Sequence, residues 1–343
     1  MSDTNNTLLA PLPSPSDLRT AIETWLQMEI ANGDPRADTV DNYRIQLNHW
    51  VTWCEVNSID IGHPSRQHVE AFRRELVEAG MAASTIAVKL TVVRQFYKSA
   101  VIRGLIATNP ATDVHPPVNR KVRDRKKNLN QVEAAELLNS LSDENSPQTL
   151  RDRAIIALAL LEGLRRVELH RANVEDIEEV EYETVGGTVT RRTRILIHGK
   201  RRDRWCYPRA DTVEALREYL DARGAVPPEE AVIHNRVERV VPMFCGLSKA
   251  GRSVRRISRR GLNWVVDGYL SKAGLKKDQI SCHALRHSCG YMTYKETKDL
   301  RAVQDTLGHA TIATAAIYAA SDHEEARYTE QIPLKLKPAR GSK

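Results

Sequence analysis

The sequence predicts a mainly α-helical protein with one small antiparallel β-sheet, arranged as two domains. Its 343 residues favour two domains at a typical size of about 100 to 200 residues each. Apolar residues recur at helical spacing through the first hundred residues and again in the C-terminal third. Between them, residues 179–207 show a strand-like pattern interrupted by two glycine-containing turns, which is typical of paired strands.

The composition is that of a folded globular protein. Hydrophobic residues make up 41 % and charged residues 28 %, which excludes a disordered or collagen-like chain. The longest apolar run, residues 154–161, is far shorter than the roughly 20 residues that span a bilayer, so no membrane association is expected. The N-terminus has no signal-peptide pattern. We therefore expect the protein to stay in the cytoplasm or the nucleoid.

The five cysteines point to no structural bridge. Their number is odd and no C-x-x-C pair occurs, so neither a disulfide framework nor a ribbon-type zinc site is indicated. Reduced, buried thiols are the expectation.

Four helices are expected in the N-terminal domain, residues 14–115. The first begins at Ser14, whose hydroxyl can accept an unpaired N–H of the first helical turn. Pro15 suits the first helical position because it has no N–H that needs a partner. The second follows Asp38, the third extends from Ser65 to a stop at Gly80, and the fourth begins near residue 84. Prolines at 110, 116 and 117 end the domain.

A linker, residues 116–127, then leads to a second domain, residues 128–330, and a tail, residues 331–343. In the second domain a helix begins at Asn130, and residues 155–161 lie in a buried helix. Three antiparallel strands are expected at 179–184, 188–197 and 204–207. From Asp211 to about Thr329 the pattern is expected to be helical again, with glycines between the helices.

Basic residues are concentrated in three clusters after the first domain. The chain carries a net charge of +7, yet the part up to Asp113 is net acidic. The clusters are residues 119–127, 200–204 and 249–260. A single cluster of this kind is as often a solvated linker, but three favour a surface that binds the phosphates of a nucleic acid. Candidate DNA contacts are Arg123, Arg125, Lys126, Lys127, Arg255 and Arg256.

Five short stretches carry candidate chemistry. Each has a structural alternative when taken alone: an ion pair for the first, a solvated lysine for the second, and a basic helix start for the third. A zinc site of Cys282, His283, His287 and Cys289 fits no common spacing, so no metal is expected. The stretches are G-L-R-R-V-E-L with Arg165 and Glu168 on one helix face, the hairpin 198–204 with Lys200, C-H-A-L-R-H with His283 and Arg286, L-G-H with His309, and I-Y with Tyr318.

In this order and spacing, the five stretches resemble the tyrosine recombinase, or phage integrase, family of DNA strand-exchange enzymes. The resemblance extends from about Ser14 to Ala320. It implies an N-terminal SAM-like, core-type DNA-binding domain and a mixed α+β catalytic domain. About 13 residues precede the first expected helix, which indicates the simple two-domain type.

The resemblance also implies roles for individual residues. It makes Tyr318 the nucleophile, makes Glu168 a supporting residue, and gives catalytic roles to Arg165, Lys200, His283, Arg286 and His309. The chain departs from the common family pattern at Glu162, at Thr306 and at Ala315-Ala316. None of these departures removes a functional group, although local packing is expected to differ.

The chemistry agrees with these roles. A tyrosine hydroxyl can conserve the energy of a broken phosphodiester as a 3′-phosphotyrosyl ester, and His283 is the candidate acceptor for its proton. Arg165 and Arg286 offer planar, permanently charged donors to the phosphate oxygens, and His309 a further hydrogen bond. Lys200 can protonate the leaving 5′ oxygen. The sequence shows no nucleotide-binding loop or metal cluster, so no cofactor is expected.

The expected partners are double-stranded DNA recombination sites and three further copies of the chain, which together form a synaptic homotetramer. This expectation is compatible with a monomer in free solution. The tail after Tyr318 has apolar residues that either pack on a neighbouring subunit or fold back on their own domain: Ala326, Tyr328, Ile332 and Leu334. Two other functions use much the same features. They are DNA relaxation by a type IB topoisomerase and DNA binding by a non-catalytic regulator.

Overall fold

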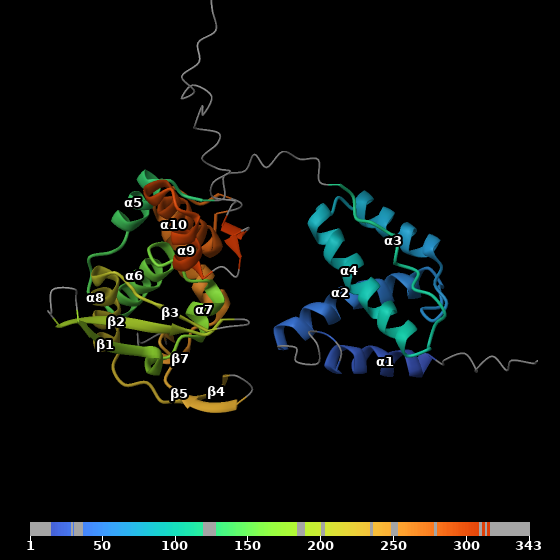
Figure 1. Cartoon of the computed structure of the whole chain (residues 1–343), viewed down its shortest axis with the longest axis horizontal. Helices are drawn as coiled ribbons and strands as arrows, with labels where there is room; N and C mark the ends of the chain where they lie inside the picture. Colours follow the sequence, from blue (N-terminus) through green and yellow to red (C-terminus); the bar gives the residue numbers. More distant parts are fainter. Residues whose placement is uncertain are drawn as a thin grey trace, which may run out of the picture. The chain divides into compact units, whose positions relative to one another are not determined.

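In the computed structural model the chain divides into two compact units, Met1–Asp124 and Arg125–Lys343, and each is described by itself. Helices and strands carry the labels of Figure 1. The structure describes residues 15–28, 30, 37–118, 128–183, 189–199, 203–233, 236–247, 253–277, 280–308, 311, 312, 314 and 315.

The described part of the first unit forms four helices, as the sequence predicts: α1 (Pro15–Met28), α2 (Ala37–Val56), α3 (Arg66–Glu78) and α4 (Ala83–Ile102). Ser65 caps α3, because its Oγ accepts the N–H of His68 at 3.3 Å while His68 Nδ1 accepts the N–H of Ser65 at 3.2 Å. The expected start of α4 is shifted slightly: Ser84 lies in its first turn, and Ala82 occupies the cap. The expected cap at Ser14 lies outside the described residues.

Aromatic residues form the centre of the first unit. Trp50 of α2 is buried against Phe72 of α3 and Tyr97 of α4, with ring centroids 5.2 and 6.3 Å away. The polar atoms of these rings are satisfied, since Trp50 Nε1 donates to Tyr97 Oη at 2.9 Å and Tyr97 Oη donates to the carbonyl of Ile61 at 3.0 Å. Burial of large apolar rings therefore holds three of the helices together.

In its described part, the second unit combines helices with three small antiparallel sheets (Figure 1). Its elements are α5 (Gln131–Asn139), α6 (Pro147–Leu160), α7 (Arg166–Arg171), the 3-10 helix η2 (Val174–Asp176), β1 (Ile177–Glu183), β2 (Val189–Ile197), β3 (Arg204–Cys206), α8 (Ala210–Arg223), β4 (Glu229–Ile233), β5 (Arg236–Val240), β6 (Cys245–Leu247), β7 (Ser253–Arg256), α9 (Arg259–Lys272), α10 (Cys282–Thr297) and α11 (Leu300–Leu307).

Helix α6 is the central helix of the second unit. Ser146 caps it and Pro147 occupies its first position. Most of its residues are buried, including Ile155 and Leu158, because other elements pack around it. The expected helix start at Asn130 is confirmed as well: Asn130 and Glu133 form a capping box of α5, with two hydrogen bonds of 2.8 Å.

The expected three-stranded sheet is confirmed. Its order is β1-β2-β3, both pairs are antiparallel, and Ile195 lies opposite Ile177 on one side and Cys206 on the other. Ile195 and Ile197 are buried while their neighbours on β2 are more exposed. This alternation fixes the register, because a shift by one residue would turn the isoleucines to solvent.

The expectation of helices throughout residues 211–329 is wrong for residues 229–233, 236–240, 245–247 and 253–256, which form strands. Two antiparallel hairpins, β4-β5 and β6-β7, lie there instead. Val232 pairs with Val237 across the first hairpin. Valine and isoleucine lose rotamer freedom in a helix and therefore favour strands. This local preference agrees with the strands observed here, where a helix was expected.

All five cysteines are free and buried, as expected. Among the described residues, no helix is both long and apolar enough to cross a membrane.

Candidate active site

Arg165 lies at the start of a short helix, and this differs from the sequence expectation. We expected Arg165 and Glu168 on one face near the end of an apolar helix. Helix α6 instead ends at Leu160, and Gly163 adopts a left-handed conformation with φ of 67° before α7 begins. A Cβ at Gly163 would lie 2.4 Å from Leu307 Cδ2, so both the conformation and the space there require glycine. Arg165 becomes the N-cap of α7.

Glu168 fixes the position of Arg165 through two contacts. Its Oε1 lies 2.6 Å from Arg165 Nη1, and its Oε2 accepts the backbone N–H of Arg165 at 2.8 Å. The Glu168 side chain is only 2 % exposed, whereas that of Arg165 is 37 % exposed. The result is a guanidinium that is oriented by a buried carboxylate and remains accessible to a ligand.

Arg286 joins the site from helix α10. Its side chain is 2 % exposed, and Nη1 lies 3.9 Å from Glu168 Oε2. Nη1 donates to the carbonyl of Gly163 and Nη2 to that of Leu307, each at 2.5 Å. Arg286 therefore connects α10 with the loop before Arg165 and with the end of α11.

His283 lies one turn before Arg286 on α10, so the expected common helix is confirmed. Its side chain is exposed, and its ring meets that of His287 edge to face with centroids 4.6 Å apart. Among the described residues, no group of three or more His, Cys, Asp or Glu side chains is arranged to hold a metal ion.

Arg204 is a member of this cluster that sequence reasoning missed. It begins β3, and its Nη2 donates to Glu168 Oε2 at 3.1 Å. The sequence places Arg204 only four residues after Lys200, within the same basic cluster. The signal that could have identified it is the alternation of side chains along a strand: Arg204 lies on the same face of β3 as the buried Cys206.

The base of the β2-β3 hairpin is held by one histidine. His198 Nε2 lies 2.8 Å from Asp176 Oδ1, and His198 Nδ1 lies 3.2 Å from Asp203 Oδ2. Asp203 also accepts the N–H of Gly199 at 3.1 Å. The hydrogen bond to Asp176 raises the pKa of His198, which favours the imidazolium between the two carboxylates. These contacts lie beside Lys200 in the sequence.

Several expected site residues lie outside the described residues: Lys200, His309, Tyr318, Arg123, Arg125, Lys126 and Lys127. The expected helix end before His309 is present, because Gly308 closes α11 in a left-handed conformation with φ of 61°.

The two remaining DNA-contact candidates are neighbours on β7 with different surroundings. Arg255 is exposed. Arg256 has a side chain only 12 % exposed, and it pairs with Glu229. We expected Arg256 to contact DNA, but its guanidinium forms its contacts with other residues of the same domain.

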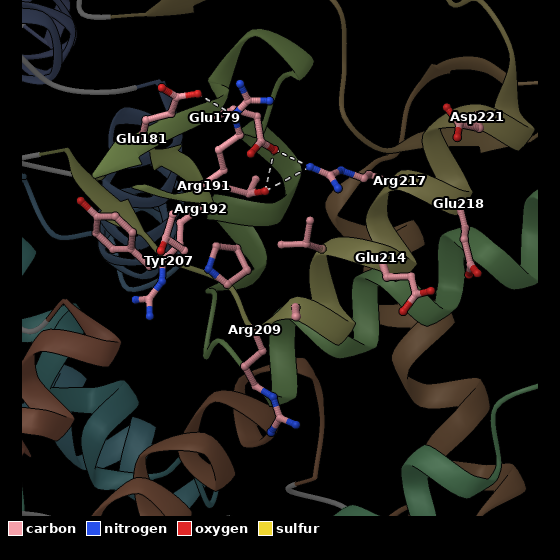
Figure 2. A pocket seen from close by; sticks show the side chains of 15 residues that line it. Glu179, Glu181, Arg191, Arg192, Tyr207, Arg209, Glu214, Arg217, Glu218 and Asp221 are labelled. Atoms are coloured by element: carbon pink, nitrogen blue, oxygen red, sulfur yellow. Dashed lines mark hydrogen bonds and ion pairs between the residues drawn. The ribbon is translucent and has the colours of Figure 1, made fainter. Parts of the chain in front are cut away.

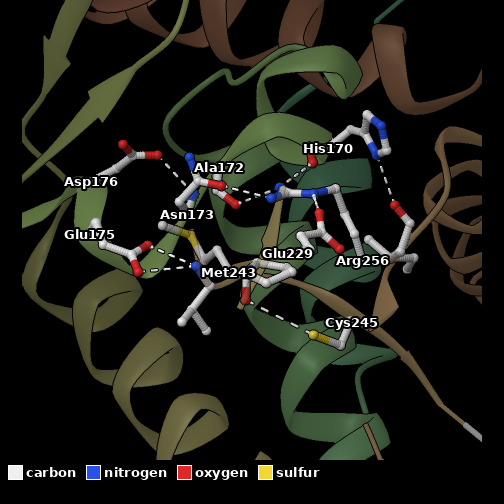
Figure 3. Close-up of polar contacts among 12 residues, drawn as sticks. His170, Ala172, Asn173, Glu175, Asp176, Glu229, Met243, Cys245 and Arg256 are labelled. Carbon is white, nitrogen blue, oxygen red and sulfur yellow. Dashed lines mark hydrogen bonds and ion pairs between the residues drawn. The ribbon is translucent and has the colours of Figure 1, made fainter. Parts of the chain in front are cut away.

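Figure 3 shows how Arg256 holds the end of α7. Its Nη1 donates to the carbonyls of His170 and Ala172 at 2.9 and 3.0 Å, and its Nη2 donates to Asn173 Oδ1 at 2.7 Å. A cation at the C-terminal end of a helix satisfies carbonyls that have no partner within the helix. Arg256 therefore supports the helix that carries Glu168.

A large open hollow, about 1370 Å³ in volume, lies elsewhere, beside the sheet and the start of α8. Figure 2 shows ion pairs on its wall, between Arg191 and Glu181 and between Arg217 and Glu179. None of the candidate catalytic residues that the structure describes lines it. Its mixed charge is unlike a phosphate site, so the Glu168 cluster remains the candidate active site.

Comparisons with known proteins identify the family of this chain. The model of the phage integrase family matches residues 127–325, and that of the phage integrase N-terminal SAM-like domain matches residues 22–104. The chain is 31 % identical to tyrosine recombinase XerC of Vibrio vulnificus (strain YJ016) over 319 residues, 91 % of this chain and 90 % of the relative. It is 29 % identical to tyrosine recombinase XerD of Corynebacterium glutamicum over 310 residues, 88 % and 93 % of the two chains.

Solved structures share the fold. XerH site-specific recombinase bound to a palindromic difH substrate matches with a TM-score of 0.67 at 19 % identity, covering 93 % of this chain and 84 % of the other. A lambda integrase dimer bound to a COC′ core site matches with a TM-score of 0.60 at 14 % identity, covering 87 % and 96 %. With a family model matched over more than half of its length, this chain belongs to the phage integrase family and is a tyrosine recombinase, a DNA strand-exchange enzyme.

Proposed function

We propose that the chain cuts and rejoins double-stranded DNA at specific recombination sites, for integration, excision or resolution, with Tyr318 as the nucleophile. The observation that carries this proposal is the set of arginines around Glu168, with Arg165 accessible beside the more deeply buried Arg286. Such a preorganised pair of guanidinium groups suits a phosphodiester, whose non-bridging oxygens gain charge during attack.

The proposed reaction is a transesterification. Tyr318 Oη attacks the phosphorus and forms a 3′-phosphotyrosyl ester, while the bond to the 5′ oxygen breaks. His283 takes the tyrosine proton and Lys200 gives a proton to the 5′ oxygen. Arg165, Arg286 and His309 stabilise the oxygens. A free 5′ hydroxyl from a partner strand then attacks the ester, which releases Tyr318 and rejoins the DNA.

The relatives support the proposed DNA partner. XerH and lambda integrase are bound to DNA sites in their solved structures, and we extend this to the present chain. We assign residues 14–115 to binding the core site, residues 116–127 to a linker, residues 128–330 to catalysis and residues 331–343 to a tail. Exchange between two DNA sites requires a homotetramer, and a DNA substrate places the enzyme at the nucleoid.

The test uses random-sequence duplexes nicked once in one strand. Cleavage near a nick releases a short fragment and traps the protein on the DNA. We expect the full chain to form an adduct that survives denaturation and is enriched for one sequence, since site-specific binding selects it. The Tyr318→Phe variant retains the ring but lacks the hydroxyl, so it should bind the selected duplex without forming an adduct. An adduct in this variant would show that another nucleophile acts, with Tyr328 and Tyr291 the next candidates.

A further inference from the structure

Arg204 occupies a position where three parts of the site meet. It starts β3, directly after the hairpin that carries Lys200. Its guanidinium reaches Glu168 Oε2 on α7, and its side chain lies across Gly308 at the end of α11. The parts of the chain that carry Lys200, Arg165 and His309 are therefore connected through one side chain.

The contact with Gly308 is unusually close. A Cβ added at Gly308 would overlap Nε and Cδ of Arg204, so one of the two residues would have to shift. The left-handed backbone at Gly308 favours glycine, and any larger residue there would also displace the Arg204 side chain. The side chain of Arg204 is 17 % exposed, so this packing is largely closed to solvent.

The charges explain why a third arginine is needed. Glu168 is a buried carboxylate whose Oε1 contacts Arg165, and whose Oε2 contacts Arg204 at 3.1 Å and lies 3.9 Å from Arg286. A buried carboxylate that loses a cationic partner is left with an uncompensated charge, which is destabilising. Arg204 supplies a partner that comes from a strand, so Arg165 and Arg286 are less strongly bound to Glu168.

The same count matches the reaction. Three arginines and one glutamate leave this cluster with a net charge of about +2. A phosphodiester carries one negative charge, and attack by an oxyanion adds a second that is spread over the phosphoryl oxygens. Arg204 neutralises Glu168 inside the domain, so the charge that remains for the phosphate is that of Arg165 and Arg286.

We propose that Arg204 is a positioning residue for strand cleavage: it holds Glu168 in place, so that Arg165 remains available to the phosphate. The proposal rests on the proposed function and names a residue for that same site. Arg204 acts through Glu168 and has no direct contact with DNA in this scheme. Lysine would keep the charge but not the planar fork, so Arg204→Lys should restore cleavage only in part.

The experiment measures single-turnover adduct formation on the duplex selected with the wild-type chain, at saturating DNA. We expect Arg204→Ala to slow cleavage about 10- to 100-fold, because a small displacement of Arg165 is costly, while the Kd changes less than about threefold. The double variant Arg204→Ala/Glu168→Gln should cleave no more slowly than the slower of the two single variants. Both substitutions act through the same contact between Arg204 and Glu168.

Two further arms separate positioning from other roles. Replacing one non-bridging oxygen of the scissile phosphate by methyl removes a negative charge. A variant that lacks a cation in direct contact with the phosphate should therefore regain part of its cleavage rate on this substrate. Arg204→Ala should gain no more from this substrate than the wild type does. Gly308→Ala should slow cleavage more in the wild-type background than in the Arg204→Ala background. The strain of the left-handed backbone is the same in both backgrounds, but only the wild-type background has the Arg204 side chain against which the new methyl group would press.

Arg194→Ala is the matched control. Arg194 lies on the neighbouring strand β2, where it pairs with Glu178 and covers the Trp205 ring at 3.8 Å. It should leave cleavage within about twofold of wild type, as expected for a surface substitution. The proposal is wrong if Arg204→Ala behaves like Arg194→Ala, if its effect multiplies with that of Glu168→Gln, or if the methylphosphonate restores its rate. None of these results would remove the adduct formed by the wild-type chain, so the proposed function is judged separately.

Discussion

Arg286 Nη1 donates to the carbonyl of Gly163 at 2.5 Å and so binds helix α10 to the loop that positions Arg165. The other end of the guanidinium binds the carbonyl of Leu307. One buried side chain thus stabilises the site as well as supplying its charge.

We therefore expect Arg286→Ala to reduce stability as well as activity. Two buried carbonyls would be left without their partner, at about 1 to 3 kcal/mol each. Arg165→Ala removes a more exposed guanidinium and should lower the Tm less. Calorimetry of both variants checks this, alongside the adduct assay. Equal Tm values for the two variants would contradict the structural part of the role of Arg286.

Arg255 and Arg256 make a matched pair on β7. Arg256→Gln should lower the Tm, because the end of α7 loses the donors to His170 and Ala172, and should leave the salt dependence of DNA binding unchanged. Arg255→Gln should do the reverse and flatten the slope of log affinity against log salt by about 0.9. Melting curves and a binding series across salt concentrations measure both effects. If Arg256→Gln alone flattens the slope, Arg256 contacts DNA after all.

The hairpin base should be sensitive to pH through His198. Its pKa lies above the ordinary value of 6.5, chiefly because of the hydrogen bond to Asp176. A pKa raised in the folded state gives stability that is complete below about pH 6.5 and is lost as pH rises through the folded-state value. The Tm of wild type should therefore exceed that of His198→Asn by more at pH 6 than at pH 8.5, by a few degrees. A difference that is the same at both pH values would show that the charge of His198 is unimportant.

Local patterns explain how much of the fold was predictable. The helices α3 and α5 and the sheet β1-β2-β3 follow from caps, turns and periodicity that act within a few residues. Residues 229–256 were mistaken for helix because glycines further along suggested helix ends, although the valines at 232 and 237 favoured strands.

The site was predictable only in part, because the use of an arginine depends on its tertiary neighbours. Arg165, Glu168 and Arg286 are brought together as their motifs suggest. Arg204 and Arg256 occur in basic clusters that look solvent-exposed in the sequence, yet one meets Glu168 and the other meets Glu229. No spacing along the chain reveals a partner 36 residues away, as for Arg204 and Glu168.

The role of Lys200 as general acid can be tested with sulfur in place of the 5′ bridging oxygen. A thiolate leaves without protonation, so Lys200→Ala should cleave normal DNA slowly and the sulfur substrate at close to the wild-type rate. Arg165→Ala should remain slow on both, because it acts on the non-bridging oxygens. Rates of adduct formation on the two substrates give the comparison. If both variants respond alike, the acid is another residue of the turn, with Arg201 and Arg202 the next candidates.

The basic linker gives the last prediction. If its cations lie along the DNA backbone, neutralising Arg123, Arg125, Lys126 and Lys127 together should weaken binding to the selected duplex and to random DNA by similar factors. The salt slope should flatten by up to about 0.9 for each phosphate that the variant no longer neutralises, since fewer counterions are released. A linker that acts only through its length would leave the slope unchanged. Weaker binding confined to the selected duplex would instead indicate base contacts, because phosphate contacts are independent of sequence.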